Sequence, residues 1–188
     1  MNNEVLKAMK TRRSIRKYKP EQITDEQLDA ILEAGTYAAT GMGKQSPVIV
    51  VVQKPELIAK LSKMNAAVMG SSNDPFYGAP TVLIILADPE IGTYHEDGSL
   101  VMGNLMAGSS CGRCGFLLDH GKEEFESAEG KELLKEWGLP EIWSASDTAS
   151  LDIVTVNTRK QKKEKRTILS EYRKSFRNCE GTEQSVRK

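Results

Sequence analysis

Thr11-Arg12-Arg13-Ser14-Ile15-Arg16-Lys17-Tyr18 is a strongly basic stretch close to the N-terminus of a chain of 188 residues. Four of its eight residues are cationic, and Ser14 places a short hydroxyl among them. An arginine presents a planar fork of N–H donors that matches the oxygens of a phosphate, which the point charge of a lysine does not. The stretch is therefore a candidate phosphate site. Spacing alone favours the simpler alternative, a solvated basic face that follows a short helix.

The segments around this stretch alternate between helical and extended patterns. Thr24 and Gln27 form a capping-box pattern ahead of an apolar stripe, which predicts a helix to about Gly35. Continuous apolar runs predict two buried strands, at 48–52 and 81–87. Further helices are predicted at 3–10, at 55–65, from 97 through 106 and, in two pieces, at 122–137. This order of elements favours an α+β fold in which helices wrap a sheet.

A second polar segment, Ala39-Thr40-Gly41-Met42-Gly43-Lys44-Gln45-Ser46-Pro47, precedes the first predicted strand. Its two glycines let the backbone approach a ligand closely, and the side chains of Thr40, Gln45 and Ser46 can hydrogen-bond that ligand. Composition alone favours an ordinary loop between a helix and a strand.

An Arg-Arg-Ser-Ile-Arg segment after a short helix, together with a Thr-Gly loop that ends in Gln45, resembles the nitroreductase-like family of FMN-dependent oxidoreductases. The resemblance covers residues 1–106 and 122–141. It implies an α+β fold with a central mixed or antiparallel sheet wrapped by helices. It also implies FMN contacts, with the phosphate and ribityl chain at Arg12, Arg13, Ser14 and Arg16 and the flavin ring at Ala39, Thr40, Gly41 and Gln45. Asn65 is a further candidate, although a polar residue on that helix could equally face water. Ala39 stands where the family commonly has proline.

The activity implied by this resemblance is hydride transfer from NAD(P)H through FMN to a small-molecule acceptor such as a nitroaromatic or a quinone. The cofactor carries that chemistry, so no catalytic acid or base is assigned. The resemblance also implies a homodimer with the flavin at the subunit interface. Two alternatives stay open: a flavin-binding relative with other chemistry, such as flavin destruction or dehalogenation, and a non-enzymatic binding module with a basic tail.

Composition narrows the class of protein. No run of about 18 apolar residues is present, so no membrane span is expected. The number of cysteines, three, argues against a disulfide framework, so a cytoplasmic protein is expected. Cys111 and Cys114 have the spacing of two metal ligands, but a second pair of ligands is missing, so no metal site is expected. Residues 157–188 hold 11 Lys/Arg and 4 Asp/Glu, a net charge of +7. The whole chain has 26 Lys/Arg and 26 Asp/Glu, so the remaining residues have a net charge of −7. No aromatic residues interleave the basic run as in single-strand binding, so nucleic acid is not expected as a partner.

The resemblance stops abruptly at two places, and a shifted reading frame explains both. Permitted codons for Gly108–Asp119, read one nucleotide later, encode Ala-Ala-His-Ala-Val-Gly-Val-Gly-Ser-Cys-Trp-Ile, which is similar to the family's buried helix and next strand. Ala145–Asp152 likewise arises from the family's Gly-Ile-Gly-His-Cys-Ile-Leu-Gly-Tyr strand. We therefore hypothesise that residues 107–121 and 142–188 are out-of-frame translation. The chain then divides into a flavin-binding domain, 1–141, and a poorly ordered basic segment, 142–188.

Overall fold

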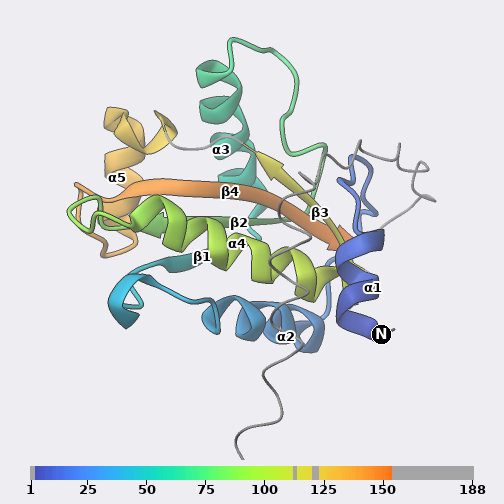
Figure 1. Ribbon diagram of the computed structural model, residues 1–188. Helices are drawn as coiled ribbons and strands as arrows, with labels where there is room; N and C mark the ends of the chain where they lie inside the picture. Colours follow the sequence, from blue (N-terminus) through green and yellow to red (C-terminus); the bar gives the residue numbers. More distant parts are fainter. Residues whose placement is uncertain (1–2, 112–113, 120–122, 154–188) are drawn as a thin grey trace, which may run out of the picture. The chain divides into compact units, whose positions relative to one another are not determined.

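The centre of the molecule is a four-stranded antiparallel sheet with the strand order β1-β2-β4-β3 (Figure 1). The computed structural model describes residues 3–111, 114–119 and 123–153, which fall within one compact unit. The strands are β1 (Val48–Val52), β2 (Thr81–Ala87), β3 (Cys114–Asp119) and β4 (Ser144–Ile153). The predicted α+β architecture is therefore present, and every pairing in the sheet is antiparallel.

Strand β2 organises the core because its side chains alternate between two hydrophobic clusters. All seven of its residues are buried. Leu83 and Ile85 join the cluster on the side of α2 and α4, whereas Val82, Ile84 and Leu86 join the cluster on the side of α3 and α5. This alternation is what the two-residue period of a strand produces when both faces of the sheet are covered.

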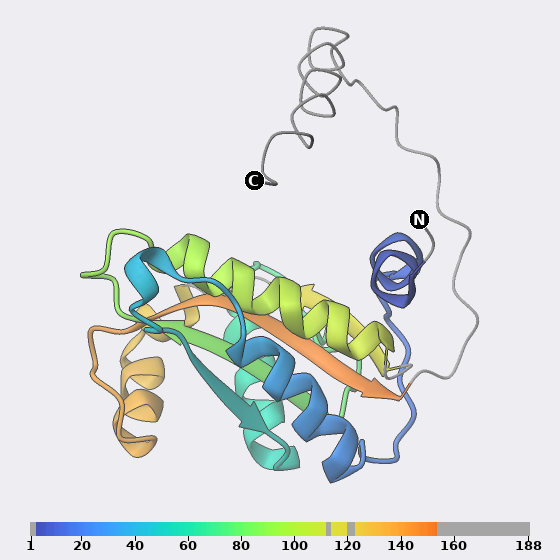
Figure 2. The ribbon, with the colours of Figure 1, turned by 60° about the horizontal axis from the view of Figure 1, so that its bottom comes forward.

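Helices cover both faces of this sheet (Figures 1 and 2). The helices are α1 (Glu4–Thr11), α2 (Asp25–Thr36), α3 (Pro55–Val68), α4 (Tyr94–Cys111) and α5 (Ala128–Glu136), with 3-10 turns η1 (Gly41–Gly43) and η2 (Glu123–Glu126). The predicted helices are thus present, including the division of 122–137 into two pieces. No helix in the described ranges is both long and apolar enough to cross a lipid bilayer.

Local sequence signals fix the starts of two of these helices. At α2 the Thr24 hydroxyl accepts a hydrogen bond from the Gln27 N–H (3.3 Å), and the Gln27 side chain accepts one from the Thr24 N–H (3.5 Å). This is the predicted capping box, which satisfies two donors that the first turn otherwise leaves unpaired. At α5 the Ser127 hydroxyl accepts from the Gly130 N–H (3.0 Å) in the same way.

Two sequence-based expectations need correction. The run 48–52 was expected to be a buried strand, but β1 pairs only with β2 and lies at the edge of the described sheet, so Val52 is its one buried residue. The chain beyond Trp143 was expected to lack order, yet Ser144–Ile153 forms β4 between β2 and β3. Backbone hydrogen bonds to β2 and β3 hold this strand, although its side-chain pattern is a weak strand signal. A domain boundary after residue 141 would therefore remove a central strand, and residues 154–188 lie outside the described ranges.

Candidate functional site

The two predicted ligand-binding segments lie at opposite ends of helix α4 (Figures 1 and 2). The loop 39–47 contacts the first turn of α4, where Asp97 accepts a hydrogen bond from the Gly41 N–H. Helix α1 and the basic stretch after it lie beside the other end of α4. The 18 residues of α4 rise about 27 Å along its axis. Within one chain the two segments are therefore far apart.

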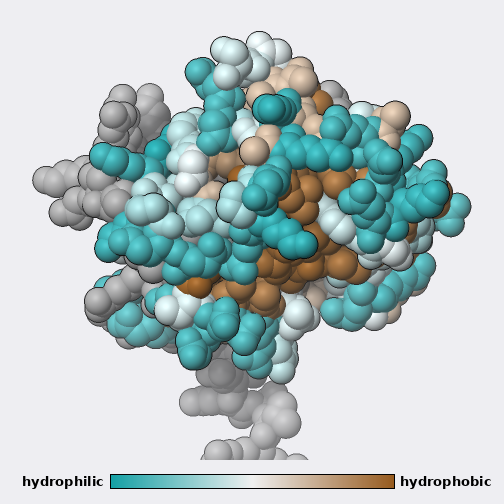
Figure 3. Space-filling model, turned by 180° about the vertical axis from the view of Figure 1, so that it is seen from behind, coloured by the Kyte–Doolittle hydropathy of each residue, from teal (hydrophilic) through white to brown (hydrophobic). Residues whose placement is uncertain are grey.

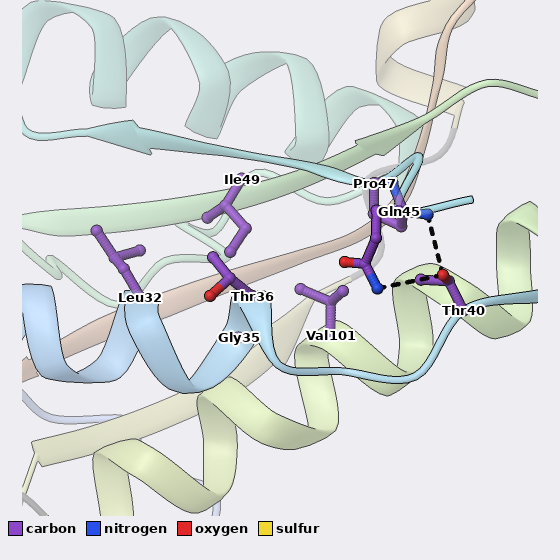
Figure 4. A pocket seen from close by; sticks show the side chains of 8 residues that line it. All are labelled: Leu32, Gly35, Thr36, Thr40, Gln45, Pro47, Ile49 and Val101. Carbon is purple, nitrogen blue, oxygen red and sulfur yellow. Dashed lines mark hydrogen bonds between the residues drawn. The ribbon is translucent and has the colours of Figure 1, made fainter. Parts of the chain in front are cut away.

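A cavity of about 390 Å³ opens beside the loop 39–47 (Figure 4). Residues from four different segments line it, namely Leu32, Gly35 and Thr36 of α2, Thr40, Gln45 and Pro47 of the loop, Ile49 of β1 and Val101 of α4. Aliphatic side chains form one part of the wall, and the side chains of Thr36, Thr40 and Gln45 supply hydrogen-bonding groups. An apolar cleft with a few polar groups is typical of sites for small organic ligands.

The loop itself has an unusual backbone. Met42 (φ 54°), Gly43 (φ 65°) and Gln45 (φ 50°) all occupy the left-handed region, which residues with a side chain rarely adopt. The Thr40 hydroxyl accepts from the Gln45 N–H (3.0 Å) and from the Gln45 side-chain amide (3.4 Å). The same amide donates to the Ala38 carbonyl (3.4 Å). Thr40 and Gln45, both predicted from the sequence, therefore face each other across the loop at the rim of the cavity.

Asp97 attaches this loop to helix α4. Its carboxylate is 2% exposed and accepts hydrogen bonds from the Gly41 N–H (2.8 Å) and from the Thr93 hydroxyl (3.0 Å). Sequence reasoning missed this role, because Asp97 reads there only as an acidic residue that opens a helix. The contact spans 56 positions in the chain, and no local pattern marks it.

In the basic stretch the Tyr18 side chain is hydrogen-bonded to the backbone, and the arginines differ in their exposure and partners. Tyr18 is buried, and its hydroxyl donates to the Ile15 carbonyl (3.0 Å). The Arg13 guanidinium donates to the carbonyls of Lys10 (3.1 Å) and Arg12 (2.6 Å). Ser14 and Arg16 are exposed. Of the four predicted phosphate contacts, these two are the most accessible, and Arg13 must turn away from its carbonyl partners to reach a ligand.

Two further residues define the surroundings of the predicted contacts. The Arg16 guanidinium lies 5.9 Å from the centre of the Tyr77 ring, within the range of a cation–π contact. Asn65 is fully buried on α3 and donates to the Glu124 carboxylate (3.3 Å). The alternative that Asn65 faces water is therefore wrong. It belongs to the α3 face of the sheet, and the structure does not bring it together with the loop 39–47.

The described part of the chain thus combines an antiparallel sheet, covered by helices on both faces (Figure 1), with a glycine-containing loop beside an apolar cavity. A model of the nitroreductase family matches residues 9–76, a range that holds both predicted segments. Two solved structures titled as nitroreductases with bound FMN share this fold. The Bacteroides fragilis protein has a TM-score of 0.81 and 23% identity, over 89% of this chain and 98% of its own. The Desulfitobacterium hafniense protein has a TM-score of 0.79 and 25% identity, over 89% of this chain and 98% of its own.

Sequence relatives are also named as nitroreductases or flavin reductases. A protein of Archaeoglobus fulgidus, named provisionally as an NADH dehydrogenase/NAD(P)H nitroreductase, is 32% identical over 113 residues, which are 57% of this chain and 62% of that protein. An FMN reductase [NAD(P)H] of Bacillus subtilis is 34% identical over 87 residues, 46% of this chain and 32% of that protein. The chain thus spans less than two thirds of the length of these relatives. The resemblance to the nitroreductase family and the α+β fold class are confirmed.

Proposed function

We propose that this chain is an oxidoreductase of the nitroreductase type, which binds FMN and transfers a hydride from NAD(P)H to a nitroaromatic, a quinone or a similar acceptor. The observation that carries the proposal is the cavity beside the loop 39–47, because all of its lining residues except Val101 lie within the range that matches the nitroreductase family. Relatives named for FMN or NAD(P)H support the choice of cofactor and electron donor. Flavin, when bound, supplies the redox chemistry, and the protein binds, orients and shields it.

The residues around the cavity fit a flavin ring. Such a ring is flat and largely apolar, with hydrogen-bonding atoms along one edge, and the cavity offers aliphatic walls together with Thr40 and Gln45. The Ser46 hydroxyl oxygen is buried and has no hydrogen-bond partner within the described ranges. A buried polar group without a partner destabilises a fold unless something satisfies it. Ser46 does not itself line the cavity, so a ligand satisfies this hydroxyl only if it enters further into the loop.

The basic stretch fits the phosphate of the same cofactor. Arg12, Arg13 and Arg16 supply forked N–H donors, and Ser14 adds a hydroxyl, a set suited to several phosphate oxygens at once. Because this set and the loop 39–47 occupy opposite ends of α4, we propose that one flavin takes its phosphate contacts from one subunit and its ring contacts from a second copy. A homodimer then contains two equivalent sites.

Two surface features support pairing with a second copy. Strand β1 lies at the edge of the described sheet, with no second strand paired to it among the described residues, and such an edge can pair with another chain. Hydrophobic surface also gathers over the middle of the face opposite to that of Figure 1 (Figure 3). Contiguous apolar surface of this kind is typical of interaction sites. Equilibrium sedimentation of the purified chain tests the dimer, and a monomer at micromolar concentration would contradict it.

The function is tested by purifying the full chain, recording its flavin absorption and measuring oxidation of NADH and NADPH against a panel of nitroaromatic and quinone acceptors. We expect a yellow protein that oxidises a nicotinamide over many turnovers only when an acceptor is present, because the flavin alone takes up one hydride per site. Flavin binding without such turnover would favour the related chemistries, flavin destruction or dehalogenation. A colourless protein that cannot be loaded with FMN, and whose binding to nucleic acid falls steeply with salt, would favour the non-enzymatic module.

A further inference from the structure

We infer that Asp97 is a positioning residue for the flavin: its buried carboxylate fixes the loop 39–47 in the conformation that presents Thr40, Gly41 and Gln45 to the ring. This inference rests on the proposed function, since it assigns to Asp97 a role in the same site. Asp97 does not line the cavity. It therefore acts through the loop and is not a catalytic residue.

The first step is that the loop needs an anchor. Met42 and Gln45 carry side chains in the left-handed region, a conformation that opposes the intrinsic preference of both residues. Met42 and Lys44 are exposed, so packing of their side chains contributes little to holding the loop. The bonds between Thr40 and Gln45 close the turn, and the bond from the Gln45 side-chain amide to the Ala38 carbonyl (3.4 Å) joins it to the chain just after α2, but none of these bonds joins the loop to α4.

The second step is that Asp97 provides this attachment. One carboxylate oxygen accepts from the Gly41 N–H (2.8 Å), and the other accepts from the Thr93 hydroxyl (3.0 Å). The acceptor is an acidic group that is 2% exposed, so water competes little for these bonds. Asp97 lies in the first turn of α4, where a carboxylate also interacts favourably with the helix dipole. The helix therefore holds Asp97, and Asp97 holds the loop.

The third step is that the contact is fitted to glycine. A Cβ on Gly41 would lie 3.0 Å from Cγ2 of Thr93 and closer still to its hydroxyl oxygen. The overlapping atoms all belong to the Thr93 side chain, so a side chain at position 41 forces either the loop or Thr93 to move, and both changes disturb the bonds to Asp97. Gly41, Thr93 and Asp97 thus form one contact, through which the start of α4 sets the position of the loop at the cavity.

The test compares FMN binding by the full chain with that of three variants. Asp97→Leu keeps the approximate shape of the side chain and removes both acceptors, whereas Asp97→Asn keeps one oxygen for the Gly41 N–H. Glu96→Gln is the matched control, because Glu96 is exposed in the same turn of α4 and the charge change is the same. We expect Asp97→Leu to raise the dissociation constant for FMN at least about tenfold and to shift the flavin absorption bands. Asp97→Asn should recover much of both, and Glu96→Gln should match the wild type.

Trypsin reports the loop without any cofactor, because Lys44 lies exposed within it. Cleavage after Lys44 should be faster in Asp97→Leu than in the wild type and in Glu96→Gln. Should Asp97→Leu fail to fold, Gly41→Ala replaces it, and we expect Thr93→Ala to restore part of the FMN affinity that Gly41→Ala loses. A folded Asp97→Leu or Gly41→Ala protein with wild-type FMN affinity, spectrum and cleavage rate would overturn the inference. A wild-type chain that binds no FMN would instead overturn the proposed function, and the flavin role of Asp97 with it.

Discussion

Helix α5 lies so close to the turn η2 that the substitution Gly130→Ala tests how these two elements pack. Gly130 is buried in the first turn of α5, and its N–H donates to the Ser127 hydroxyl that caps the helix (3.0 Å). A Cβ at this position would lie 2.6 Å from Cα of Phe125 and closer still to the carbonyl oxygen of Glu124. Both are backbone atoms, so no change of rotamer relieves the overlap. Either η2 or the start of α5 must move.

The size of the effect follows from the nature of these contacts. Adding a methyl group to a packed site destabilises a protein by about 1–3 kcal/mol. Because the neighbours of Gly130 are backbone atoms, we expect Gly130→Ala to lower the free energy of unfolding by about 3 kcal/mol. For a chain of this size each kcal/mol lowers the unfolding temperature by about 2–4 °C, so we expect a decrease of roughly 6–12 °C. The measurement is thermal unfolding followed by circular dichroism.

Gly103→Ala is the matched control for this prediction. Gly103 lies in helix α4, and a Cβ there would meet no heavy atom within 4 Å. The substitution should raise the free energy of unfolding by about 0.5–1 kcal/mol, because alanine loses less conformational entropy than glycine in a helix. An unfolding temperature for Gly130→Ala that equals or exceeds the wild-type value, alongside the expected rise for Gly103→Ala, would refute the packing of α5 against η2.

The basic stretch, the capping box and the second half of the chain carry the remaining predictions. Arg12→Ala, Arg13→Ala and Arg16→Ala should each weaken the binding of FMN by roughly 1.5–3 kcal/mol, as measured by a fluorescence titration. Unchanged FMN affinity in all three variants would refute the phosphate assignment. Thr24→Ala should lower the free energy of unfolding in urea by about 1 kcal/mol, and no change would show that the capping box contributes little. Protein from a frame-corrected gene should contain more bound flavin, and its dimer should unfold more cooperatively, than protein with the unaltered sequence. Equal values for both, or an uninterrupted frame in the source DNA, would refute the frame-shift hypothesis.

Sequence by itself determined the elements that depend on neighbouring residues. Thr24 and Gln27 are three positions apart, so the capping box and the start of α2 follow from local geometry. The apolar run Thr81–Ala87 predicted β2 to the residue, because a strand covered on both faces needs such a run. The two polar segments, 11–18 and 39–47, were proposed as ligand contacts from the sequence, since forked arginine donors suit phosphate oxygens and glycines beside hydrogen-bonding side chains allow close contact with a ligand.

Tertiary structure decided how these segments meet. The bond from Gly41 to Asp97 and the burial of Asn65 against Glu124 join residues 56 and 59 positions apart, and no periodic pattern extends over such distances. The central place of β4 depends on the hydrogen-bonding edge that β2 offers, which the largely polar sequence of 144–153 does not reveal. The separation of the two segments along α4 is likewise set by the packing of α1 and the loop 39–47 against one helix. Local preferences fix each element, whereas the burial of one common core fixes which distant residues become neighbours.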